Sequence, residues 1–292
     1  MVRDISPTVG FIGLGRMGKP MALNLLAAGI HLVVHSRSQG PIDELTSADA
    51  QSADDLDEIT ASADIIFTCL PDETTSESVY LGPSGLIPGC RPSNLFVETS
   101  TISPTLAIRT CEAAIEKGAT YIDAPVSGGV GGARNAVLTI MAGGDPRDIK
   151  RAMPFLKHMG TTVHHVGEVG RGEVVKLINQ LLVAVHTQAA CEAIVLAMKA
   201  GVDPHQVLEV LSTSWGNSAM LGRTGPMVAD RNYGSAAPTR LIAKDIGLVL
   251  GLARDVGLTL PLVEESQKVL HRAVEAGLSE ADVAALATLI SD

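Results

Sequence analysis

Residues 9–20 read Val-Gly-Phe-Ile-Gly-Leu-Gly-Arg-Met-Gly-Lys-Pro: an apolar strand enters three glycines, and a helical stretch from Pro20 to Ala28 leaves them. Gly13 permits a tight turn, Gly15 lets the backbone approach a pyrophosphate, and Gly18 lets the helix lie close to the strand. The unpaired N–H groups at the helix start then face an anion. An ordinary strand–helix turn is the alternative, but the flanking strand and helix favour a dinucleotide site. The residues predicted to bind the dinucleotide here are Gly13, Leu14, Gly15, Arg16 and Met17.

Length, charge and cysteine content narrow the class of protein. The chain has 292 residues, a formal net charge of −10 and four cysteines far apart in the sequence. This length suits two domains or one large one, and it allows a substantial core without covalent staples. The acidic balance argues against non-specific nucleic-acid binding and against a polybasic membrane patch. The cysteine spacing indicates reduced thiols in a cytosolic protein rather than a disulfide framework or a zinc site.

The sequence also shows no signal for targeting, membrane insertion or metal binding. The glycine loop begins by residue 10 and leaves no room for a signal peptide before it. We find no apolar run long and uninterrupted enough to span a bilayer. His164, His165 and His186 lack metal-ligand spacing with another His, Asp or Glu, so we predict no metal. The expected location is the cytoplasm.

Short apolar strands alternate with helical stretches along the first 165 residues. Several strands are continuous apolar runs, as expected when helices cover both faces of a parallel sheet. The alternation predicts a doubly wound α/β domain of the Rossmann type over residues 1–166. The predicted strands are Thr8–Ile12, His31–His35, Ile65–Cys69, Leu95–Glu98, Thr120–Asp123, Leu138–Ala142 and Thr161–His165.

The pattern changes after Gly167, where helical stretches follow one another without a comparable strand signal. Asp203-Pro204 combines a cap with a first-turn proline, which is typical of a helix start. We therefore predict an all-α domain over residues 167–292. Its long first helix is mostly apolar and must pack on a neighbouring domain or another subunit, so we expect a homo-oligomer, either a dimer or a tetramer. The predicted helices are Glu173–Ala200, Leu241–Val256, Leu262–Ala276 and Glu280–Ile290.

The end of the second predicted strand bears on which dinucleotide binds. In an NAD site an acidic residue about 20 residues past the glycines accepts bonds from the ribose hydroxyls. Ser36 stands at that place, followed by Arg37 and Ser38. A carboxylate would repel a 2′-phosphate, whereas an arginine with flanking hydroxyls attracts one. This chemistry favours NADP; the alternative is that Arg37 is a solvated turn residue and that NAD binds without its carboxylate.

A second glycine-rich segment, Asp123 to Ala133, follows a predicted strand. Ser127 offers a hydroxyl there, and Gly128 and Gly129 expose backbone N–H groups. Such a turn can cradle a carboxylate. A flexible glycine loop is the alternative interpretation.

A third segment, Gly170 to Asn179, leads glycines into a helix on which Lys176 and Asn179 lie three residues apart, on one face. The neighbouring side chains are apolar. A lysine there is costly unless it meets a charge, an acceptor or a function. The alternative is a lysine whose ammonium group extends to the surface.

These segments together resemble the β-hydroxyacid dehydrogenase family, which includes 3-hydroxyisobutyrate dehydrogenase and tartronate semialdehyde reductase. The resemblance covers nearly the whole chain, and its parts occur in the family's order. Six ordered matches are more specific than any one of them. They are the glycine loop with Met17-Gly18-Lys19-Pro20-Met21-Ala22, then Cys69-Leu70-Pro71-Asp72, Ser100-Thr101-Ile102-Ser103-Pro104, the Ser127 loop, the Lys176–Asn179 helix and Lys244-Asp245-Ile246-Gly247-Leu248.

The resemblance implies roles for particular residues. Lys176 would carry the catalytic proton, and Asn179 would help to hold the substrate beside it. Ser127, Gly128 and Gly129 would bind the carboxylate of a small substrate. The family fold, a Rossmann domain followed by an all-helical domain, would place the site in the cleft between them. The further cofactor contacts implied by the resemblance are Leu70, Pro71, Thr101 near the nicotinamide end and Lys244 from the helical domain.

Departures from the family pattern bear on the substrate. Ala237 and Ser218 stand where family members often have aromatic residues, which suggests a roomier or more polar pocket than 3-hydroxyisobutyrate requires. The run Gln180 to His186 is similar to the threonate dehydrogenase branch, which handles four-carbon sugar acids. The expected function is therefore hydride transfer between NADP, or NAD, and the hydroxyl carbon of a small β-hydroxyacid or a related semialdehyde, with threonate as the alternative substrate.

Two other functions fit the same fold, because this fold hosts many activities. A non-catalytic dinucleotide-sensing protein could lose the catalytic lysine, yet Lys176 and Asn179 are both present. Imine-reducing relatives do not keep a lysine at this place, so Lys176 favours alcohol–carbonyl chemistry.

Overall fold

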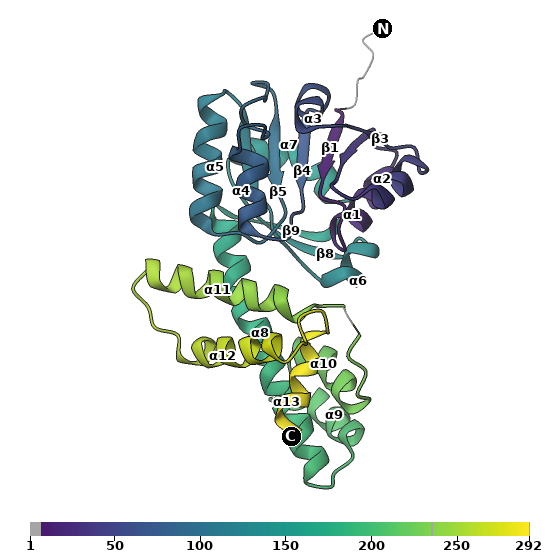
Figure 1. Cartoon of the computed structure of the whole chain (residues 1–292), viewed down its shortest axis with the longest axis vertical. Helices are drawn as coiled ribbons and strands as arrows, with labels where there is room; N and C mark the ends of the chain where they lie inside the picture. The colour runs from purple at the N-terminus through teal and green to yellow at the C-terminus, as the bar shows by residue number, and fades with distance from the viewer. Residues whose placement is uncertain (1–6, 235, 292) are drawn as a thin grey trace. The chain divides into compact units, whose positions relative to one another are not determined.

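The computed structural model describes residues 7–234 and 236–291 and divides into two compact units, Met1–Lys176 and Leu177–Asp292 (Figure 1). The first unit is built around a sheet, and the second is helical.

Within the described part of the first unit, nine strands form one sheet in the order β3-β2-β1-β4-β5-β6-β8-β7, with β9 beside β8. The strands β3, β2, β1, β4, β5 and β6 are parallel, as predicted. Strand β8 pairs antiparallel with β6 through Asp123 and Gly143, so the sheet is mixed and not wholly parallel. The strands are β1 Val9–Ile12, β2 Leu32–His35, β3 Gln51–Ser52, β4 Ile65–Thr68, β5 Leu95–Glu98, β6 Thr120–Asp123, β7 Val126–Ser127, β8 Leu138–Gly143 and β9 Gly160–Gly167.

All seven predicted strands are confirmed: two have the predicted bounds, and the ends of the others differ by at most two residues. Strands β3 and β7 were not predicted, because each is only two residues long and depends on a distant partner for its pairing. The helices of this unit are α1 Gly18–Ala27, α2 Gln39–Thr46, α3 Leu56–Ser62, α4 Glu73–Leu81, α5 Pro104–Glu116, α6 Gly129–Arg134 and α7 Pro146–Leu156.

Several of these helices begin at side-chain caps that sit just after a strand end. Asp72 accepts a hydrogen bond from the Thr75 amide at 2.7 Å and starts α4. Ser103 accepts one from the Leu106 amide at 3.1 Å and starts α5. Each such cap contributes about 1 kcal/mol. Together they fix the chain direction where the turns leave the carboxyl ends of the strands.

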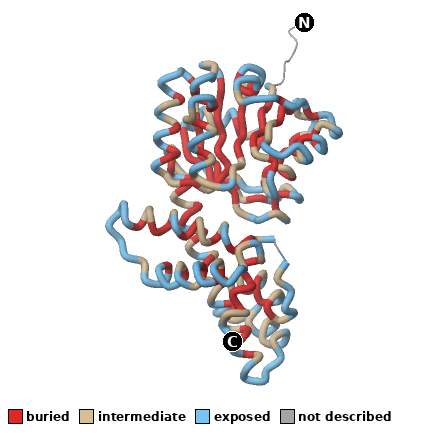
Figure 2. The backbone as a smooth tube through the Cα atoms, viewed as in Figure 1, coloured by how far each residue is buried: buried red, intermediate tan, exposed pale blue. Residues whose placement is uncertain are grey.

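The core of the first unit has two layers, one on each face of the sheet. Phe11 and Phe67 stack on one face, and Tyr80 meets Phe96 and Tyr121 edge to face on the other. Adjacent strand residues alternate between the two layers. Figure 2 shows central strands such as β1, β4 and β5 buried along their length. Both faces are therefore covered, which explains why the strands are continuous apolar runs.

The described residues of the second unit form helices joined by turns and loops, as predicted, with an isolated bridge between Pro238 and Asp282 in place of any strand. Asp203 caps its second helix by accepting from the His205 amide at 3.0 Å, as its sequence indicates. Its core includes Cys191, whose Sγ donates to the Ala284 carbonyl at 3.6 Å. Burial raises the pKa of Cys191 to about 12. The helices are α8 Arg171–Lys199, which begins in the first unit, α9 Pro204–Ser212, α10 Ala219–Ala229, α11 Thr239–Asp255, α12 Pro261–Glu275, the 3-10 helix η1 Val283–Ala287 and α13 Thr288–Ser291.

The predicted helix Glu280–Ile290 is wrong: its residues form the short η1 and α13 instead. Asp282 is fully buried and accepts from the amides of Ala237 and Ala284, at 2.8 and 3.0 Å. It also pairs with Arg223 at 2.5 Å. These bonds hold the backbone at Asp282 in a non-helical conformation, with a ψ of 144°, which prevents a continuous helix through it.

The expectation about membrane-spanning runs also needs correction. Helix α8 is long and apolar enough to cross a membrane by length and composition, with a mean hydropathy of 1.7 in its most apolar window. Core helices of soluble proteins meet the same criteria, so this feature alone is weak evidence. The first turns of α8 contain the buried Glu173 and Lys176, which are polar.

Candidate active site

The predicted cofactor-binding segments converge at one edge of the sheet. Ile12 at the end of β1 is in register with His35 of β2 and Thr68 of β4, and Thr68 is in register with Glu98 of β5. The carboxyl ends of these four parallel strands therefore lie side by side, where ligands bind in open α/β sheets. The predicted residues that follow these ends are Gly13 to Met17, Ser36 to Ser38, Leu70 and Pro71, and Thr101.

The glycines of the first loop have different geometric reasons to be glycine. Gly13 has a φ of +91°, and a Cβ there would lie 2.3 Å from the Cys69 carbonyl oxygen. A Cβ on Gly18 would lie 1.9 Å from the Gly13 carbonyl oxygen. Gly15 is exposed, and a Cβ there would meet no atom within 4 Å. Gly13 and Gly18 thus serve the close packing of the turn, while Gly15 faces open space. In the same loop Leu14 is buried, Arg16 exposed and Met17 half-buried.

A buried glutamate ties two of the converging loops together. The Ser100 hydroxyl donates to Glu98 Oε1 at 2.5 Å and accepts from the Leu70 amide at 2.6 Å. The Ser100 amide and the Thr68 hydroxyl also donate to Glu98 Oε1, at 2.8 and 2.9 Å. Burial raises the pKa of Glu98, although these hydrogen bonds act in the opposite direction. Glu98 was not predicted; a charged residue that ends the apolar strand Leu95–Glu98 was the available signal.

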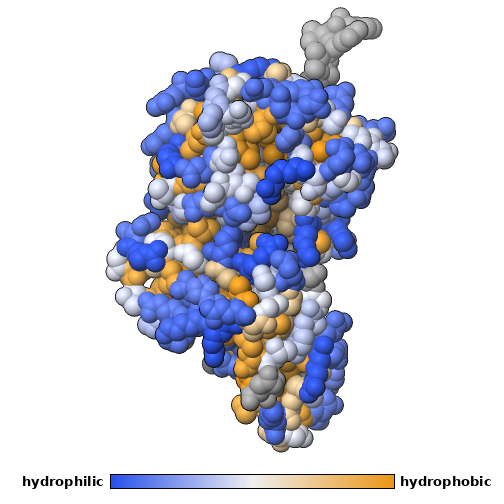
Figure 3. All heavy atoms as spheres, in the orientation of Figure 1, coloured by the Kyte–Doolittle hydropathy of each residue, from blue (hydrophilic) through white to orange (hydrophobic). Residues whose placement is uncertain are grey.

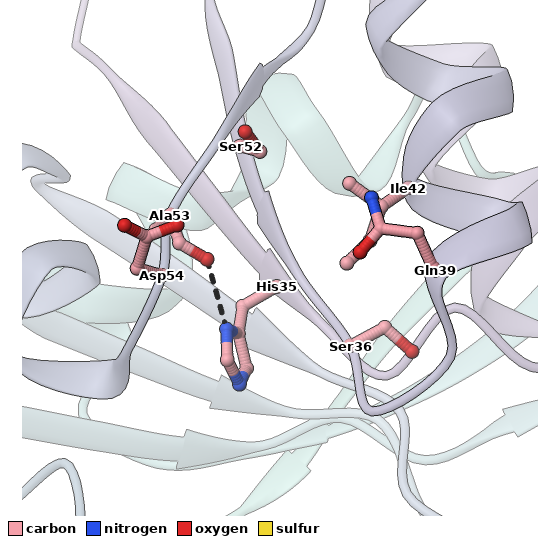
Figure 4. Close-up of a pocket in the computed structure, with 7 residues that line it drawn as sticks. All are labelled: His35, Ser36, Gln39, Ile42, Ser52, Ala53 and Asp54. Carbon is pink, nitrogen blue, oxygen red and sulfur yellow. Dashed lines mark hydrogen bonds between the residues drawn. The ribbon is translucent and has the colours of Figure 1, made fainter.

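A cavity of about 150 Å³ lies at the end of β2 (Figure 4). His35 lines it, and its Nδ1 lies 3.0 Å from the Ala53 carbonyl oxygen, which can only accept a hydrogen bond. Nδ1 therefore carries the proton of the neutral ring. Ser36 lines this cavity, whereas Arg37 and Ser38 are exposed and do not. The remaining lining residues are Gln39, Ile42, Ser52, Ala53 and Asp54.

The predicted carboxylate cradle lies where β7 enters α6. Ser127 ends β7 and is half-buried. Gly128 and Gly129 follow with φ values of +134° and +62°, conformations that side chains rarely adopt. A Cβ on Gly129 would meet no atom within 4 Å, while one on Gly128 would lie 3.0 Å from Leu138. The segment is thus a defined strand–helix turn with exposed glycine backbone.

Helix α8 begins against a buried carboxylate. Asp123, at the end of β6, accepts from the Gly170 amide at 2.8 Å and from the Glu173 amide at 2.9 Å. Burial raises the pKa of Asp123 to about 6, although bonds from these amides lower it. Glu173 Oε2 accepts from the Ile102 amide at 3.2 Å, next to Thr101. Lys176, one turn further along α8, has only 6% of its surface exposed, so nearly all of the residue is shielded from solvent.

The second unit contains a polar chain that links two other predicted residues. Asn179 Nδ2 donates to Gln180 Oε1 at 2.9 Å, and Gln180 Nε2 donates to Asp245 Oδ2. The Lys244 ammonium lies 3.0 Å from Asp245 Oδ1. Gln180 and Asp245 are 7% and 6% exposed. The structure therefore connects Asn179 with Lys244 through two residues that were not predicted, although both occur in the runs quoted for the family resemblance.

Two of the histidines considered as metal ligands, His165 and His186, lie on β9 and α8. His165 Nε2 lies 3.1 Å from the Gly144 carbonyl and 3.0 Å from the Gly167 carbonyl. In the part of the chain that the structure describes, no three His, Cys, Asp or Glu side chains group closely enough to hold a metal ion.

Both units match known protein families. Residues 8–167 match the NAD-binding domain of 6-phosphogluconate dehydrogenase. Residues 170–290 match the family described as the NAD-binding domain of NADP-dependent 3-hydroxyisobutyrate dehydrogenase.

Curated proteins and a solved structure are similar over nearly the full length. The 3-hydroxyisobutyrate dehydrogenase of Pseudomonas aeruginosa is 37% identical over 87% of this chain and 88% of its own length. The 2-hydroxy-3-oxopropionate reductase of Escherichia coli K12 is 37% identical over 95% of each chain. The structure of Mycobacterium tuberculosis 3-hydroxyisobutyrate dehydrogenase with L-serine is 30% identical, with a TM-score of 0.90 over 99% of this chain and 100% of that one.

Proposed function

Because the chain belongs to the β-hydroxyacid dehydrogenase family, which includes 3-hydroxyisobutyrate dehydrogenase, we propose that Lys176 and Asn179 carry its chemistry. The chain is a nicotinamide-dependent oxidoreductase of small hydroxyacids, as its curated relatives are. The observation that carries the assignment is the burial of Lys176 in the first turns of α8, in the unit that also contains the glycine loop. A buried ammonium group there is costly unless it meets a charge, an acceptor or a function, and the family resemblance favours a function.

Lys176 acts as the general acid or base of the reaction. A bound nicotinamide supplies or accepts the hydride at the carbinol carbon. In the reducing direction the Lys176 ammonium donates a proton to the carbonyl oxygen as negative charge develops on it. In the oxidising direction neutral Lys176 takes the hydroxyl proton. Asn179, one turn further along α8, holds the substrate beside it.

The substrate carboxylate binds at the turn between β7 and α6. The Ser127 hydroxyl and the amides of Gly128 and Gly129 are its donors, and exposed glycine backbone with positive φ supports this role. The preferred substrate is a small β-hydroxyacid such as 3-hydroxyisobutyrate, or a related semialdehyde. A four-carbon sugar acid such as threonate is the second candidate, favoured by the small side chains Ala237 and Ser218.

The cofactor is held by the loops after β1, β2, β4 and β5, and by Lys244. NADP is preferred over NAD, because Ser36 and Ser38 flank Arg37 where an NAD site would have an acid. The family matched by residues 170–290 is described as NADP-dependent, which agrees with this preference. We further propose that the protein is cytoplasmic and that it forms a homo-oligomer through apolar residues exposed on α8, which are Ile178, Leu182 and Leu196.

The first test measures nicotinamide absorbance with 3-hydroxyisobutyrate, glycerate, serine, threonate and 4-hydroxybutyrate, each with NADP and with NAD. Lys176→Ala should lower kcat by about 10²–10⁴-fold, because the transition state loses its proton donor, while the Kd for the cofactor stays within about twofold. Lys199→Ala, on the other end of the same helix, is the matched control and should keep wild-type turnover.

Two results would contradict the proposal. One is a Lys176→Ala enzyme that keeps more than about a tenth of its activity. The other is tight NADP binding without turnover of any acid in the panel, which favours a dinucleotide-sensing protein.

A further inference from the structure

Both oxygens of Asp123 are engaged by the backbone at the start of α8. Oδ1 accepts from the Gly170 amide at 2.8 Å and Oδ2 from the Glu173 amide at 2.9 Å. The partners lie 47 and 50 residues away in the sequence, and the carboxylate is fully buried. The first amides of a helix have no partner within the helix, and negative charge is favourable there. Asp123 thus satisfies two donors that would otherwise be buried without an acceptor.

Two glycines make room for this carboxylate. A Cβ on Gly143, the β8 residue paired with Asp123, would lie 2.6 Å from Asp123 Oδ1. A Cβ on Gly172 would lie 2.7 Å from Asp123 Oδ2 and 2.3 Å from the Met141 carbonyl oxygen. No side chain fits at either place without displacing the carboxylate or the helix. The strand ends and the helix start are therefore shaped around an aspartate at position 123.

We propose that Asp123 is a positioning residue for Lys176, an inference that rests on the proposed function. The carboxylate fixes where α8 begins and how its first turn is rotated, and Lys176 follows Glu173 by three residues on that turn. Each residue of slippage along a helix rotates a side chain by about 100° and shifts it by about 1.5 Å. A misplacement of about 1 Å can cost about 100-fold in rate. Small movements of this turn therefore matter to the proton donor.

The same turn also binds the loop after β5, which is proposed to contact the cofactor, so movement of this turn would also move that loop. Glu173 Oε2 accepts from the Ile102 amide, beside Thr101. Asp123 therefore orients, through one helical turn, both the proposed proton donor and the loop proposed to lie near the nicotinamide. It contacts neither substrate nor cofactor in this scheme and acts through α8 alone.

Asp123→Asn provides the kinetic test. Asparagine keeps the size of the side chain, but it offers one acceptor oxygen and turns an NH₂ donor toward the second amide. We expect kcat to fall about 30-fold, with the KM for the hydroxyacid changed less than about threefold. The number of folded sites is counted by NADPH fluorescence titration, so that unfolded molecules do not lower the measured kcat. The matched control is Asp145→Asn, which alters the aspartate cap of α7, a helix without proposed site residues.

Amide hydrogen exchange tests whether Asp123 anchors the start of α8, and this measurement does not require enzymatic turnover. In Asp123→Asn the amides of residues 170–176 should exchange at least about tenfold faster, while those of α7 keep their wild-type rate. Labelling of Lys176 by an amine reagent, measured against Lys199 by mass spectrometry, should rise at least about threefold as the turn loosens. Asp123→Ser, which keeps one hydroxyl acceptor, replaces the asparagine variant if that protein does not fold.

The outcomes separate this inference from the proposed function. An active wild-type enzyme whose Asp123→Asn variant keeps kcat within about twofold overturns the positioning role, even if the melting temperature falls. Unchanged exchange and unchanged Lys176 labelling overturn it as well. A wild type that turns over no hydroxyacid overturns the proposed function, and exchange and labelling then still decide whether Asp123 holds the turn that carries Lys176.

Discussion

At the scale of single residues, the titration of Asp123 should change the free energy of unfolding measurably, because its pKa of about 6 lies above the ordinary 3.8. A raised pKa means that the folded protein binds the proton more tightly than the unfolded chain. The resulting stabilisation is complete below about pH 3.8 and is lost as the pH rises through 6. The other titratable groups near Asp123 are Glu173, Cys111 and Tyr121.

The prediction compares wild type with Asp123→Asn, which retains all three neighbours. The free energy of unfolding of wild type minus that of the variant should fall by about 2 kcal/mol between pH 4 and pH 7. Urea unfolding followed by circular dichroism at several pH values measures this difference. A difference that stays constant, or that grows with pH, would show that Asp123 does not titrate as its burial requires.

Site residues could be predicted from sequence only when they belong to a local pattern. The glycines of the first loop and the pair Lys176–Asn179 stand within short motifs. Asp123 was part of a quoted motif, but its role depends on amides 47 and 50 residues away. Gln180 and Asp245 meet across 65 residues. Such partners are created by the pairing of strands and helices, and no local spacing encodes them.

At the scale of elements, the turn between β1 and α1 separates packing from binding. Gly18→Ala should lower the free energy of unfolding by about 2 kcal/mol, because its Cβ overlaps the Gly13 carbonyl oxygen. Gly15→Ala should change stability by less than about 0.5 kcal/mol, because nothing lies near its Cβ. It should instead raise the Kd for the dinucleotide about tenfold, since the methyl group occupies the approach to the pyrophosphate.

Urea unfolding and NADPH fluorescence titration measure the two effects. Gly40→Ala, an exposed glycine in α2 whose Cβ would meet no atom within 4 Å, is the control for adding a methyl group. Equal stability of the Gly18 and Gly40 variants would refute the packing argument. Unchanged cofactor affinity in Gly15→Ala would refute the binding argument.

Elements with strong periodicity were predicted well, and those set by tertiary contacts were not. The long strands and helices α8, α11 and α12 follow their apolar patterns. Helix α10 was missed because Gly222, Gly225 and Pro226 are poor helix formers, and the helix depends on packing instead. The helix expected at Glu280–Ile290 fails at Asp282, whose buried bonds to Arg223 and Ala237 outweigh local helix propensity.

At the scale of the whole molecule, apolar surface remains uncovered in a single chain. On the face drawn in Figure 3, apolar residues reach the surface of the helical unit. Leu196 on α8 is 70% exposed. If α8 forms the contact between copies, Leu196→Glu should raise the dissociation constant of the oligomer at least about tenfold. Sedimentation velocity across a concentration series measures this.

Leu262 on α12 is 71% exposed and provides the matched control. Leu262→Glu adds the same charge at an equally exposed leucine and should leave the association unchanged. The assignment of α8 to the contact is excluded if Leu196→Glu sediments as the wild type does. It is also excluded if the two variants dissociate equally.

The buried thiol of Cys191 offers a way to measure local opening of the helical unit. Alkylating reagents attack the thiolate, and a thiol with a pKa of about 12 supplies almost none at neutral pH. The other cysteines, Cys69, Cys90 and Cys111, are half-buried and lie in the first unit. The rate at which Cys191 is alkylated therefore reports how often the helical unit opens locally. It does so separately from opening of the first unit and without any introduced label.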